Sequence, residues 1–424
     1  MLGQTDLYEH YFRCKPDDSH GSFLQGFEFC NFLYGAVVVC SGEYLMINTN
    51  IDWAELDWQE ELKNNVTTLD QLKAYADFSE EEEQKLSAVT QVLPINIPRY
   101  YLSLIDRSNP ADPIRKMCFP DAEELIVEDA LGKTTQDPYG DDKHDKGNGV
   151  LHKYDYSTLV VATECCAMHC RHCFRRRIVS RKTDHILKDF EKAIEYIETH
   201  PDITNVILSG GDPLILSTPV LRKMIMPLAE IDHLDFVRIG SRTPASYPLR
   251  LFDDELIDLL DEFNRKKALY VPTHFNHVNE ITPTATEGIR RLRNVGITVN
   301  NQAVLLKGVN DSAEDITALM RNLLRVGVNP YYLYQCMPVS RVRHHFQVPL
   351  KRGIEIVDEA RQYLDGYAKR FKFIIGHDVG KLEICGMLDG RILLKQIHAR
   401  SGHKEDSARL ILQEIDDQAG WVTL

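Results

Sequence analysis

The chain has 424 residues, 43% of them hydrophobic, and a formal net charge of −14 from 49 Lys+Arg against 63 Asp+Glu. This composition is typical of a globular protein and excludes collagen-like and disordered classes. The acidic balance argues against a nucleic-acid partner, because such binding surfaces carry a basic patch. No stretch is long and apolar enough to predict a membrane span, and the first residues lack a signal-peptide pattern. We therefore expect a cytoplasmic protein.

Residues 1–150 are predicted to form an N-terminal, mostly helical region. Acidic amphipathic patches predict short helices at 51–65, 67–79 and 79–89. Thr68 and Ser79 are suitable N-caps for two of them. Residues 132–149 contain glycine, proline and aspartate without apolar periodicity, which predicts a loop and a domain boundary.

Beyond residue 150, apolar runs that predict strands alternate with helical patterns. The predicted strands lie at 158–163, 205–210, 235–240, 268–275, 297–305 and 329–336. The predicted helices lie at 187–200, 220–231, 255–266, 286–296, 316–327 and 353–367. Six strand–helix units in succession indicate parallel strands with right-handed crossovers, in a partial (β/α)6 barrel or an open sheet. Polar or small motifs fall at the carboxyl ends of the strands, where parallel β/α folds build active sites, and this favours the barrel.

Four cysteines crowd into nine residues after the first of these strands: Cys165, Cys166, Cys170 and Cys173. In a reducing compartment such a cluster indicates a metal or catalytic site rather than disulfides. The CxxxCxxC spacing of the last three suits three corners of a 4Fe-4S cluster, with the fourth corner left open. A structural zinc site is the alternative, with Cys165 or a histidine of the same loop as fourth ligand.

The motifs together closely resemble the lysine 2,3-aminomutase family of the radical S-adenosylmethionine (SAM) superfamily. The resemblance covers about residues 50–385 and rests on TECCAMHCRHCFRRR, LSGGDPL, RIGSRTP, HFNHVNEIT, NNQAVLLKGVND and NPYYLYQC. It implies an amino acid 2,3-aminomutase, an isomerase that starts its reaction with a 5′-deoxyadenosyl radical. The implied cofactors are a 4Fe-4S cluster, SAM and pyridoxal phosphate (PLP). The implied partners are a small amino acid substrate and a flavodoxin- or ferredoxin-type reductant, and a homo-oligomer is expected.

By this resemblance the three cysteines Cys166, Cys170 and Cys173 hold the cluster, whose open iron binds SAM. The residues expected beside the methionine part of SAM are Ser209, Gly210, Gly211 and Asp212. Their glycines permit close backbone approach, although the same motif could be a plain strand-to-helix turn. His274 would pack near the adenosyl group, or could equally be a satisfied histidine at a strand end.

The resemblance also implies a second set of residues, for PLP and for the substrate. Arg242, Gln302 and Lys153 would bind the PLP phosphate, Lys153 standing where the family typically has arginine. Lys381 is the best match for the lysine that forms a Schiff base with PLP, although the family's glycine run before it is missing. Arg175 matches the arginine that clamps the substrate carboxylate. The candidate catalytic residues are therefore Lys381 and Arg175. We expect residues 151–377 to form the barrel, and 378–424 a C-terminal segment that carries Lys381.

The end of the site that would meet the substrate side chain departs from the lysine-specific pattern. One family carboxylate corresponds to Met337 here, and the other falls near Ile374. Met337 cannot satisfy a buried ammonium. We therefore expect a substrate other than ordinary L-lysine, or one whose distal charge meets Asp378 or His377.

Three other interpretations stay open from the sequence. A radical SAM enzyme of this family could lack PLP and catalyse another hydrogen abstraction. An aminomutase could act on lysine destined for a translation factor, as in elongation factor P relatives. The cluster could also serve a non-catalytic iron–sulfur protein.

Overall fold

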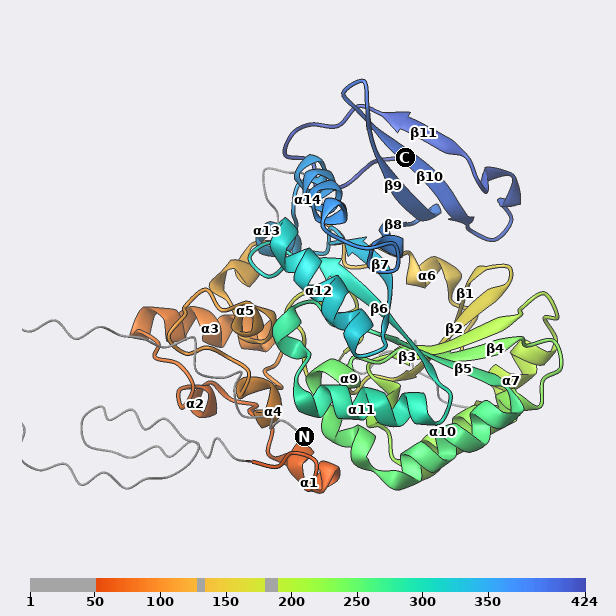
Figure 1. Cartoon of the computed structure of the whole chain (residues 1–424), viewed down its shortest axis with the longest axis horizontal. Helices are drawn as coiled ribbons and strands as arrows, with labels where there is room; N and C mark the ends of the chain where they lie inside the picture. The colour runs from red at the N-terminus through yellow and green to blue at the C-terminus, as the bar shows by residue number, and fades with distance from the viewer. Residues whose placement is uncertain (1–50, 128–133, 180–189) are drawn as a thin grey trace, which may run out of the picture. The chain divides into compact units, whose positions relative to one another are not determined.

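A single sheet of eleven strands organises the part of the chain that the computed structural model describes, which is residues 51–127, 134–179 and 190–424 (Figure 1). The strands follow one another in the sheet in chain order. They are β1 (Val150–Tyr154), β2 (Ser157–Thr163), β3 (Asn205–Gly210), β4 (Phe236–Ile239), β5 (Ala268–Thr273), β6 (Thr298–Leu305), β7 (Asn329–Gln335), β8 (Lys372–His377), β9 (Gly380–Leu388), β10 (Arg391–Ala399) and β11 (Leu410–Gln413).

The strands from β2 to β8 pair in parallel, whereas β1 and the strands after β8 pair antiparallel. The six predicted parallel strands are β2 to β7, so the predicted α/β barrel is confirmed. Strand β8 adds a seventh parallel strand, and the chain then turns back through Asp378 and Val379 into β9. This turn brings Lys381 to the second position of β9, beside the end of β8.

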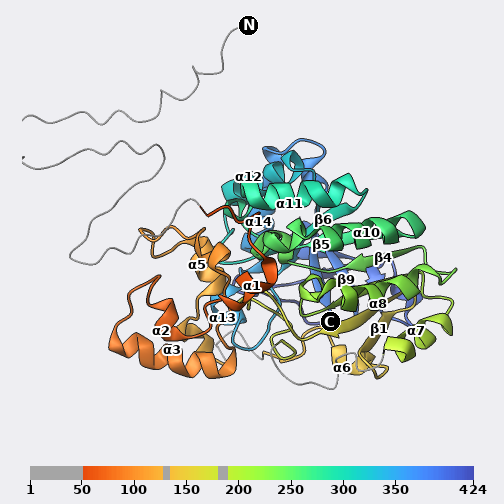
Figure 2. The same cartoon turned by 90° about the horizontal axis from the view of Figure 1, so that it is seen from below.

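Helices connect the parallel strands and cover the outside of the sheet (Figures 1 and 2). The longer ones are α7 (Phe190–Glu198), α8 (Thr218–Ala229), α10 (Asp254–Lys266), α11 (Pro283–Asn294), α12 (Ala313–Arg325) and α14 (Leu350–Gln362). Two short helices, α9 (Thr243–Ser246) and α13 (Arg343–Phe346), lie between them in the chain. The six predicted helices are confirmed, except that residues 187–189 of the first lie outside the described residues and the last ends at Gln362.

The helices before β1 are α1 (Trp58–Lys63), α2 (Leu69–Leu72), α3 (Glu80–Val92), α4 (Arg99–Leu102), α5 (Pro113–Cys118) and α6 (Asp141–His144). The predicted N-caps are confirmed: Thr68 caps α2 and Ser79 caps α3, each through a capping box. The prediction that 132–149 is only a loop is wrong for Asp141–His144, which form α6 after Gly140, a residue with φ of +74°. Residues 1–50 and 128–133 of the predicted N-terminal region lie outside the described residues.

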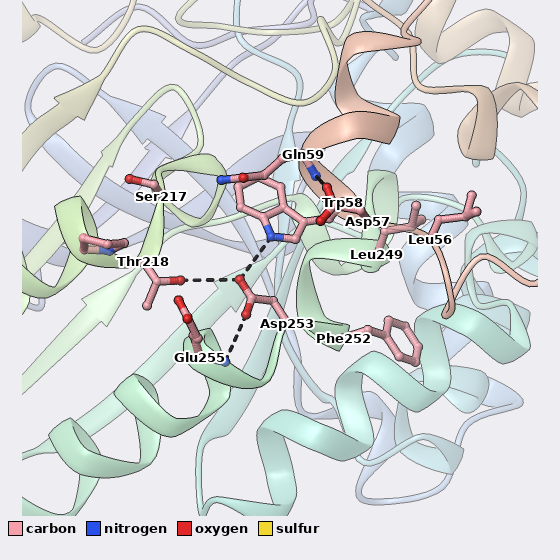
Figure 3. Close-up of a pocket in the computed structure, with 11 residues that line it drawn as sticks. Leu56, Asp57, Trp58, Gln59, Ser217, Thr218, Leu249, Phe252, Asp253 and Glu255 are labelled. Atoms are coloured by element: carbon pink, nitrogen blue, oxygen red, sulfur yellow. Dashed lines mark hydrogen bonds between the residues drawn. The ribbon is translucent and has the colours of Figure 1, made fainter.

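The N-terminal helices dock on the barrel through polar as well as apolar contacts. The indole Nε1 of Trp58 donates to Asp253, the N-cap of α10, over 3.0 Å (Figure 3). The guanidinium carbon of Arg250 lies 4.1 Å from the Trp58 ring centroid. The hollow drawn in Figure 3 is therefore a docking seam between α1 and the barrel, with a volume of about 330 Å³.

Two large apolar clusters and a small third one around Val161 hold the described residues together. The larger lies between the sheet and its outer helices and includes Leu208, Val237 and Phe263. The smaller joins the N-terminal helices to the loop after β2 and includes Tyr101 and Met168. Among the described residues, no helix is long and apolar enough to cross a membrane.

Candidate active site

A cavity of about 830 Å³ opens inside the barrel, and its lining contains every residue that the sequence singled out for cofactors or catalysis. These residues are Lys153, Cys166, Cys170, Cys173, Arg175, Ser209, Gly210, Gly211, Asp212, Arg242, His274, Gln302 and Lys381. They come from the loop after β2, from the ends or interiors of β3 to β6, and from β1 and β9. Residues more than 200 positions apart in the chain therefore face the same space.

The cysteine loop, residues 164–179, is held by the N-terminal region through its backbone. The amide nitrogen of Asn96 donates to the carbonyl oxygen of Cys166 over 3.0 Å, and that of Asn65 donates to the carbonyl of Ala167 over 2.8 Å. The backbone N–H of His169 donates in turn to the carbonyl of Asn96. These bonds fix the loop although it has no helix or strand of its own.

One buried carboxylate fixes the same loop through its side chains. Glu124, which is 1% exposed, accepts two hydrogen bonds from Arg171, at 2.7 and 2.8 Å, and a third from Arg176 at 2.5 Å. Burial opposes ionisation of Glu124, but the two guanidiniums lower its pKa below the usual value. Arg177 pairs with Asp137 and Asp142. Of the three consecutive arginines, only Arg175 lines the cavity, as expected from the sequence.

Three thiols of the loop, those of Cys166, Cys170 and Cys173, line the cavity. Burial raises the pKa of all three, that of Cys173 to about 11, so metal binding must displace thiol protons. Cys165 is exposed and lies outside the lining, and the Nδ1 atom of His169 is bonded to the carbonyl of Pro94. Of the fourth zinc ligands that the loop offers, Cys165 and His169 are therefore turned away from the three thiols, whereas His172 lines the cavity with them.

The Ser-Gly-Gly-Asp motif at the end of β3 packs directly on the cysteine loop. The backbone N–H of Gly211 donates to Thr163 over 2.6 Å, and that of Asp212 donates to the carbonyl of Cys165 over 2.8 Å. A Cβ on Gly211 would lie 2.2 Å from this carbonyl oxygen, so only glycine fits there. The motif therefore positions the cysteine loop whether or not it also contacts a cofactor.

The Asp212 carboxylate ties β3 to the end of β4. It accepts hydrogen bonds from the Ser241 hydroxyl at 2.6 Å and from the backbone N–H groups of Arg242 and Thr243 at 2.8 and 2.9 Å. Burial raises the pKa of Asp212, while these donors oppose the rise. Asp212 also caps the turn that follows it, through the N–H of Leu214.

Arg242, which the resemblance assigns to a phosphate, contacts the cysteine loop and its surroundings. Its Nη1 donates to Sγ of Cys170 over 2.8 Å, its Nε donates to the carbonyl of His274, and its Nη2 pairs with Glu280 at 2.7 Å and contacts the Tyr101 hydroxyl. All three nitrogens are thus engaged beside the thiols. We call this part of the cavity, formed by Cys170, Arg242 and His274, the cysteine end.

His274 and Gln302 both line the cavity as uncharged polar side chains. Burial and the nearby charge of Arg242 lower the pKa of His274 to about 4, so its imidazole is neutral at pH 7. Gln302 lies on β6, and within the described residues its side-chain amide has no hydrogen-bond partner. Both groups are therefore available to a neutral part of a bound molecule.

Lys381 points into the cavity from β9. Its Nζ lies 5.0 Å from the ring centroid of Tyr332, and no hydrogen bond or ion pair to it occurs within the described residues. Burial, with the charges of Arg238 and Lys153, lowers the pKa of Lys381 to about 7. This shift makes the neutral amine, which can attack a carbonyl, accessible near neutral pH.

Lys153 lies near Lys381, but its ammonium group already makes hydrogen bonds to the chain. Its Nζ donates to the carbonyls of Tyr139 and His377 over 2.7 and 2.9 Å, and lies 3.7 Å from the Tyr139 ring centroid. Burial lowers the pKa of Lys153 to about 8. We call the part of the cavity formed by Lys153, Arg238 and Lys381 the lysine end.

Arg175 faces a carboxylate of the chain itself. Its Nε donates to Asp141 of α6 over 3.1 Å, and its Nη1 contacts the Ser209 hydroxyl at 3.4 Å. Burial opposes ionisation of Asp141, but Arg175 keeps its pKa below the usual value. A substrate carboxylate at Arg175 must share the guanidinium with Asp141 or displace it.

The wall expected to meet a substrate side chain is apolar. A Cβ on Gly376 would lie 2.7 Å from Cε of Met337 and 3.1 Å from the ring of Tyr139, so these groups are in close contact. The expectation that Asp378 or His377 meets a distal charge is not supported. Asp378 pairs with Lys143 over 2.7 Å, and neither residue is among the described residues that line the cavity.

Sequence reasoning missed two charged residues of the cavity, Asp141 and Arg238. Asp141 lies in the acidic stretch whose composition predicts a loop. Arg238 interrupts the otherwise apolar run of β4, and this interruption was the available signal, because a charge inside a buried strand needs a partner.

A parallel barrel with three thiols at its carboxyl edge is the arrangement of a radical SAM enzyme, and the Radical SAM superfamily matches residues 160–320. The chain is 38% identical to the L-lysine 2,3-aminomutase of Clostridium subterminale over 75% of this chain and 74% of that protein. It is 38% identical to that of Fusobacterium nucleatum over 76% and 73%, and 34% identical to the glutamate 2,3-aminomutase of Clostridioides difficile over 76% and 74%. A solved radical SAM methyltransferase from Sphaerobacter thermophilus covers 53% of this chain and 68% of its own at 17% identity, with a TM-score of 0.35, too low to argue from.

The chain belongs to the lysine 2,3-aminomutase family of radical SAM enzymes. It is therefore an isomerase of the aminomutase type. Membership implies a 4Fe-4S cluster and SAM.

Proposed function

We propose that the chain is a PLP-dependent amino acid 2,3-aminomutase whose substrate carries no distal ammonium. The observation that supports this best is the shared cavity, where three thiols and the low-pKa amine of Lys381 face one space. The cluster ligands would be Cys166, Cys170 and Cys173. When bound, the cluster and SAM supply a hydrogen-abstracting radical, and PLP supplies a π-system that delocalises an unpaired electron.

The residues at the cysteine end would hold the cluster and orient the loop that carries its ligands. Arg242 donates to the sulfur of Cys170, and Asp212 holds the loop that follows β4 against the cysteine loop. Gly210 and Gly211 leave no room for a Cβ against Val161, Thr163 and Cys165, so they let the end of β3 pack directly on the segment that carries the thiols. These residues fix the position from which hydrogen abstraction starts.

The residues between the two ends would bind the amino acid. Arg175 presents guanidinium hydrogens to a carboxylate, with Ser209 as a neighbouring hydroxyl. Lys381 supplies the amine that holds PLP between turnovers, since its neutral form is populated at pH 7. Met337 and Tyr139 line the cavity without a carboxylate, so an ammonium placed there would be unpaired.

The test is anaerobic reconstitution of the full chain with iron, sulfide, SAM, PLP and a reductant, followed by an amino acid panel read by mass spectrometry. The panel contains L-lysine, L-glutamate, and small, branched and aromatic L-amino acids. We expect SAM-dependent formation of a β-amino acid from a member other than L-lysine. Preferred conversion of L-lysine would contradict the substrate proposal, and full activity of PLP-free protein would contradict PLP dependence.

A further inference from the structure

The guanidinium of Arg175 is held by the chain on one of its two sides. Its Nε donates to Oδ2 of Asp141 over 3.1 Å, and its Nη2 lies 3.5 Å from Oδ1 of the same carboxylate. Among the described residues its Nη1 has a single, long hydrogen bond, 3.4 Å to the Ser209 hydroxyl. A guanidinium can present two parallel hydrogens to a carboxylate on either side. Asp141 uses the Nε side and leaves the side formed by Nη1 and Nη2.

Both members of this ion pair are buried and line the cavity. Asp141 is 5% exposed and Arg175 is 7% exposed. Water screens two buried charges only weakly, so each strongly affects the other. The guanidinium carbon of Arg175 also lies 4.8 Å from the ring centroid of Phe174. Contacts with Asp141 and Phe174 thus restrict the orientation of the guanidinium.

Helix α6, which carries Asp141, is anchored independently of Arg175. The backbone N–H of Asp141 donates to the Asp137 side chain over 2.9 Å, and Asp137 is paired with Arg177 of the cysteine loop. Lys143 of α6 pairs over 2.7 Å with Asp378, in the turn between β8 and β9. Asp141 therefore keeps its place without help from Arg175, and a bound molecule does not need to hold it there.

The remaining side of Arg175 has no carboxylate of the chain to bind. Among the described lining residues the carboxylates are those of Asp141 and Asp212, and Asp212 is bonded to Ser241 and to the backbone after β4. The hydrogens of Nη1 and Nη2 are therefore available to a bound molecule. Two hydrogens in one plane fit a single carboxylate.

We infer that Asp141 is a positioning residue: it holds Arg175 by the Nε side, so that the Nη1 side binds the α-carboxylate of an amino acid in one orientation. The inference rests on the proposed function, because it assumes that Arg175 meets a substrate carboxylate. The negative charge of Asp141 lies beside that carboxylate and repels it. Asp141 therefore lowers the affinity for the amino acid while it defines the orientation in which the amino acid reacts.

The test compares L-leucine and L-phenylalanine, each with its α-carboxamide, which lacks the carboxylate. Isothermal titration calorimetry measures the four dissociation constants for the full chain reconstituted with iron, sulfide, SAM and PLP, without a reductant. We expect Asp141→Asn to bind both amino acids about tenfold more tightly, because a like charge beside the bound carboxylate is removed. Binding of the carboxamides should change by less than about twofold.

The matched control is Asp142→Asn, which makes the same charge change one position further along α6. Asp142 pairs with Arg177 and is not among the described residues that line the cavity. We expect all four constants to stay within about twofold of the wild type. Equal tightening in this control would mean a general effect of charge and would overturn the inference. Weaker binding of amino acids and carboxamides alike in Asp141→Asn would show that Asp141 only supports the fold, with the same consequence.

Kinetics and a complex structure test the orientation itself. With the amino acid that the wild type converts best, Asp141→Asn should lower KM and kcat together, since the amino acid binds more tightly but less precisely. A higher KM with an unchanged kcat would contradict the positioning role. A crystal structure of the wild type with L-leucine should keep Asp141 within hydrogen-bond distance of Nε of Arg175, and a displaced Asp141 would refute the shared guanidinium.

Failure of the inference can be told apart from failure of the proposed function. A wild type that prefers the amino acids to their carboxamides, with the same constants in Asp141→Asn, refutes the positioning role alone. A wild type that binds the amino acids no better than the carboxamides shows that Arg175 meets no carboxylate, and this refutes the proposed function as well.

Discussion

The Nη1 atom of Arg242 lies 2.8 Å from Sγ of Cys170, and the same guanidinium is paired with buried Glu280. A donor to a cluster sulfur stabilises the more negative, reduced cluster. We therefore expect Arg242→Gln/Glu280→Gln to lower the cluster reduction potential by on the order of 60–120 mV, the equivalent of one charge-assisted hydrogen bond. Redox titration followed by electron paramagnetic resonance measures this shift. Glu280→Gln alone keeps the donor and removes the balancing negative charge, so it should raise the potential instead. An unchanged potential in the double variant would contradict the assigned contact.

The cysteines of the loop should differ in their effect on iron content. Serine in place of Cys166, Cys170 or Cys173 removes one of three thiols that line the cavity, so the reconstituted chain should lose most of its iron and sulfide. Cys165→Ser should retain them, because that thiol is exposed and only its backbone carbonyl contacts Asp212. Iron and sulfide analysis, together with visible absorption, measures the cluster content of each variant. Loss of the cluster in Cys165→Ser would show that the wrong three ligands were chosen.

Formation of the PLP adduct should follow the titration of Lys381. Burial lowers the pKa of this amine from 10.5 to about 7, so the nucleophilic, neutral form predominates above pH 7 and is lost below it. The rate of adduct formation should therefore rise with pH, with a midpoint near 7, and then level off. Stopped-flow absorbance measures it.

A matched pair of variants checks that Lys381 is the group responsible. Lys381→Ala should abolish borohydride trapping, whereas Lys372→Ala, at an amine paired with Glu383 on the neighbouring strand, should leave it intact. A midpoint near the ordinary lysine pKa of 10.5 would mean that the attacking amine is not buried.

Met337 should control the use of substrates with a distal ammonium. Met337→Asp places a carboxylate on the wall shared with Tyr139, and we expect kcat/KM for L-lysine to rise by about tenfold or more relative to the wild type. Met337→Asn has a similar shape without the charge and should give no such gain. Steady-state assays with L-lysine compare the three proteins. An equal gain in both variants would indicate a steric effect instead of a charge.

Gly211 should tolerate no side chain. Gly211→Ala would place a Cβ 2.2 Å from the carbonyl oxygen of Cys165, and we expect a loss of about 1–3 kcal/mol in the free energy of unfolding, with lower iron content. Gly366→Ala is the control, because nothing lies within 4 Å of the added Cβ. Denaturant unfolding of both variants measures the difference. Equal free energies of unfolding for the two variants would show that the cysteine loop shifts to accommodate the added Cβ without loss of stability.

The strands and helices could be predicted because each depends on a local pattern. The apolar runs of β2 to β7 and the 3.6-residue periodicity of α10 and α12 need no knowledge of their neighbours. The carboxyl ends of parallel strands meet at one edge, so the motifs that follow them were predicted to share a site. For this reason every candidate residue lies in the cavity lining, although the lining also contains residues that were not candidates.

The partners of the charged residues could not be predicted, because they depend on which segments meet. Two arginines four positions apart, Arg238 and Arg242, look alike in the sequence. The loop after β4 brings Arg242 to Glu280 and Cys170, whereas Arg238 meets the first residues of β2 and β3. Asp141 likewise reaches Arg175 only because a short helix forms within an otherwise irregular stretch.

The clamp of Glu124 on Arg171 and Arg176 limits how this chain can be divided. A shortened chain that began at β1 would keep all the parallel strands and every cysteine of the loop. It would nevertheless leave two buried guanidiniums without their shared carboxylate, and the loop backbone without Asn65 and Asn96. The barrel alone therefore does not determine the conformation of its cysteine loop. A chimaera that grafts this loop onto another barrel must also include the preceding helices.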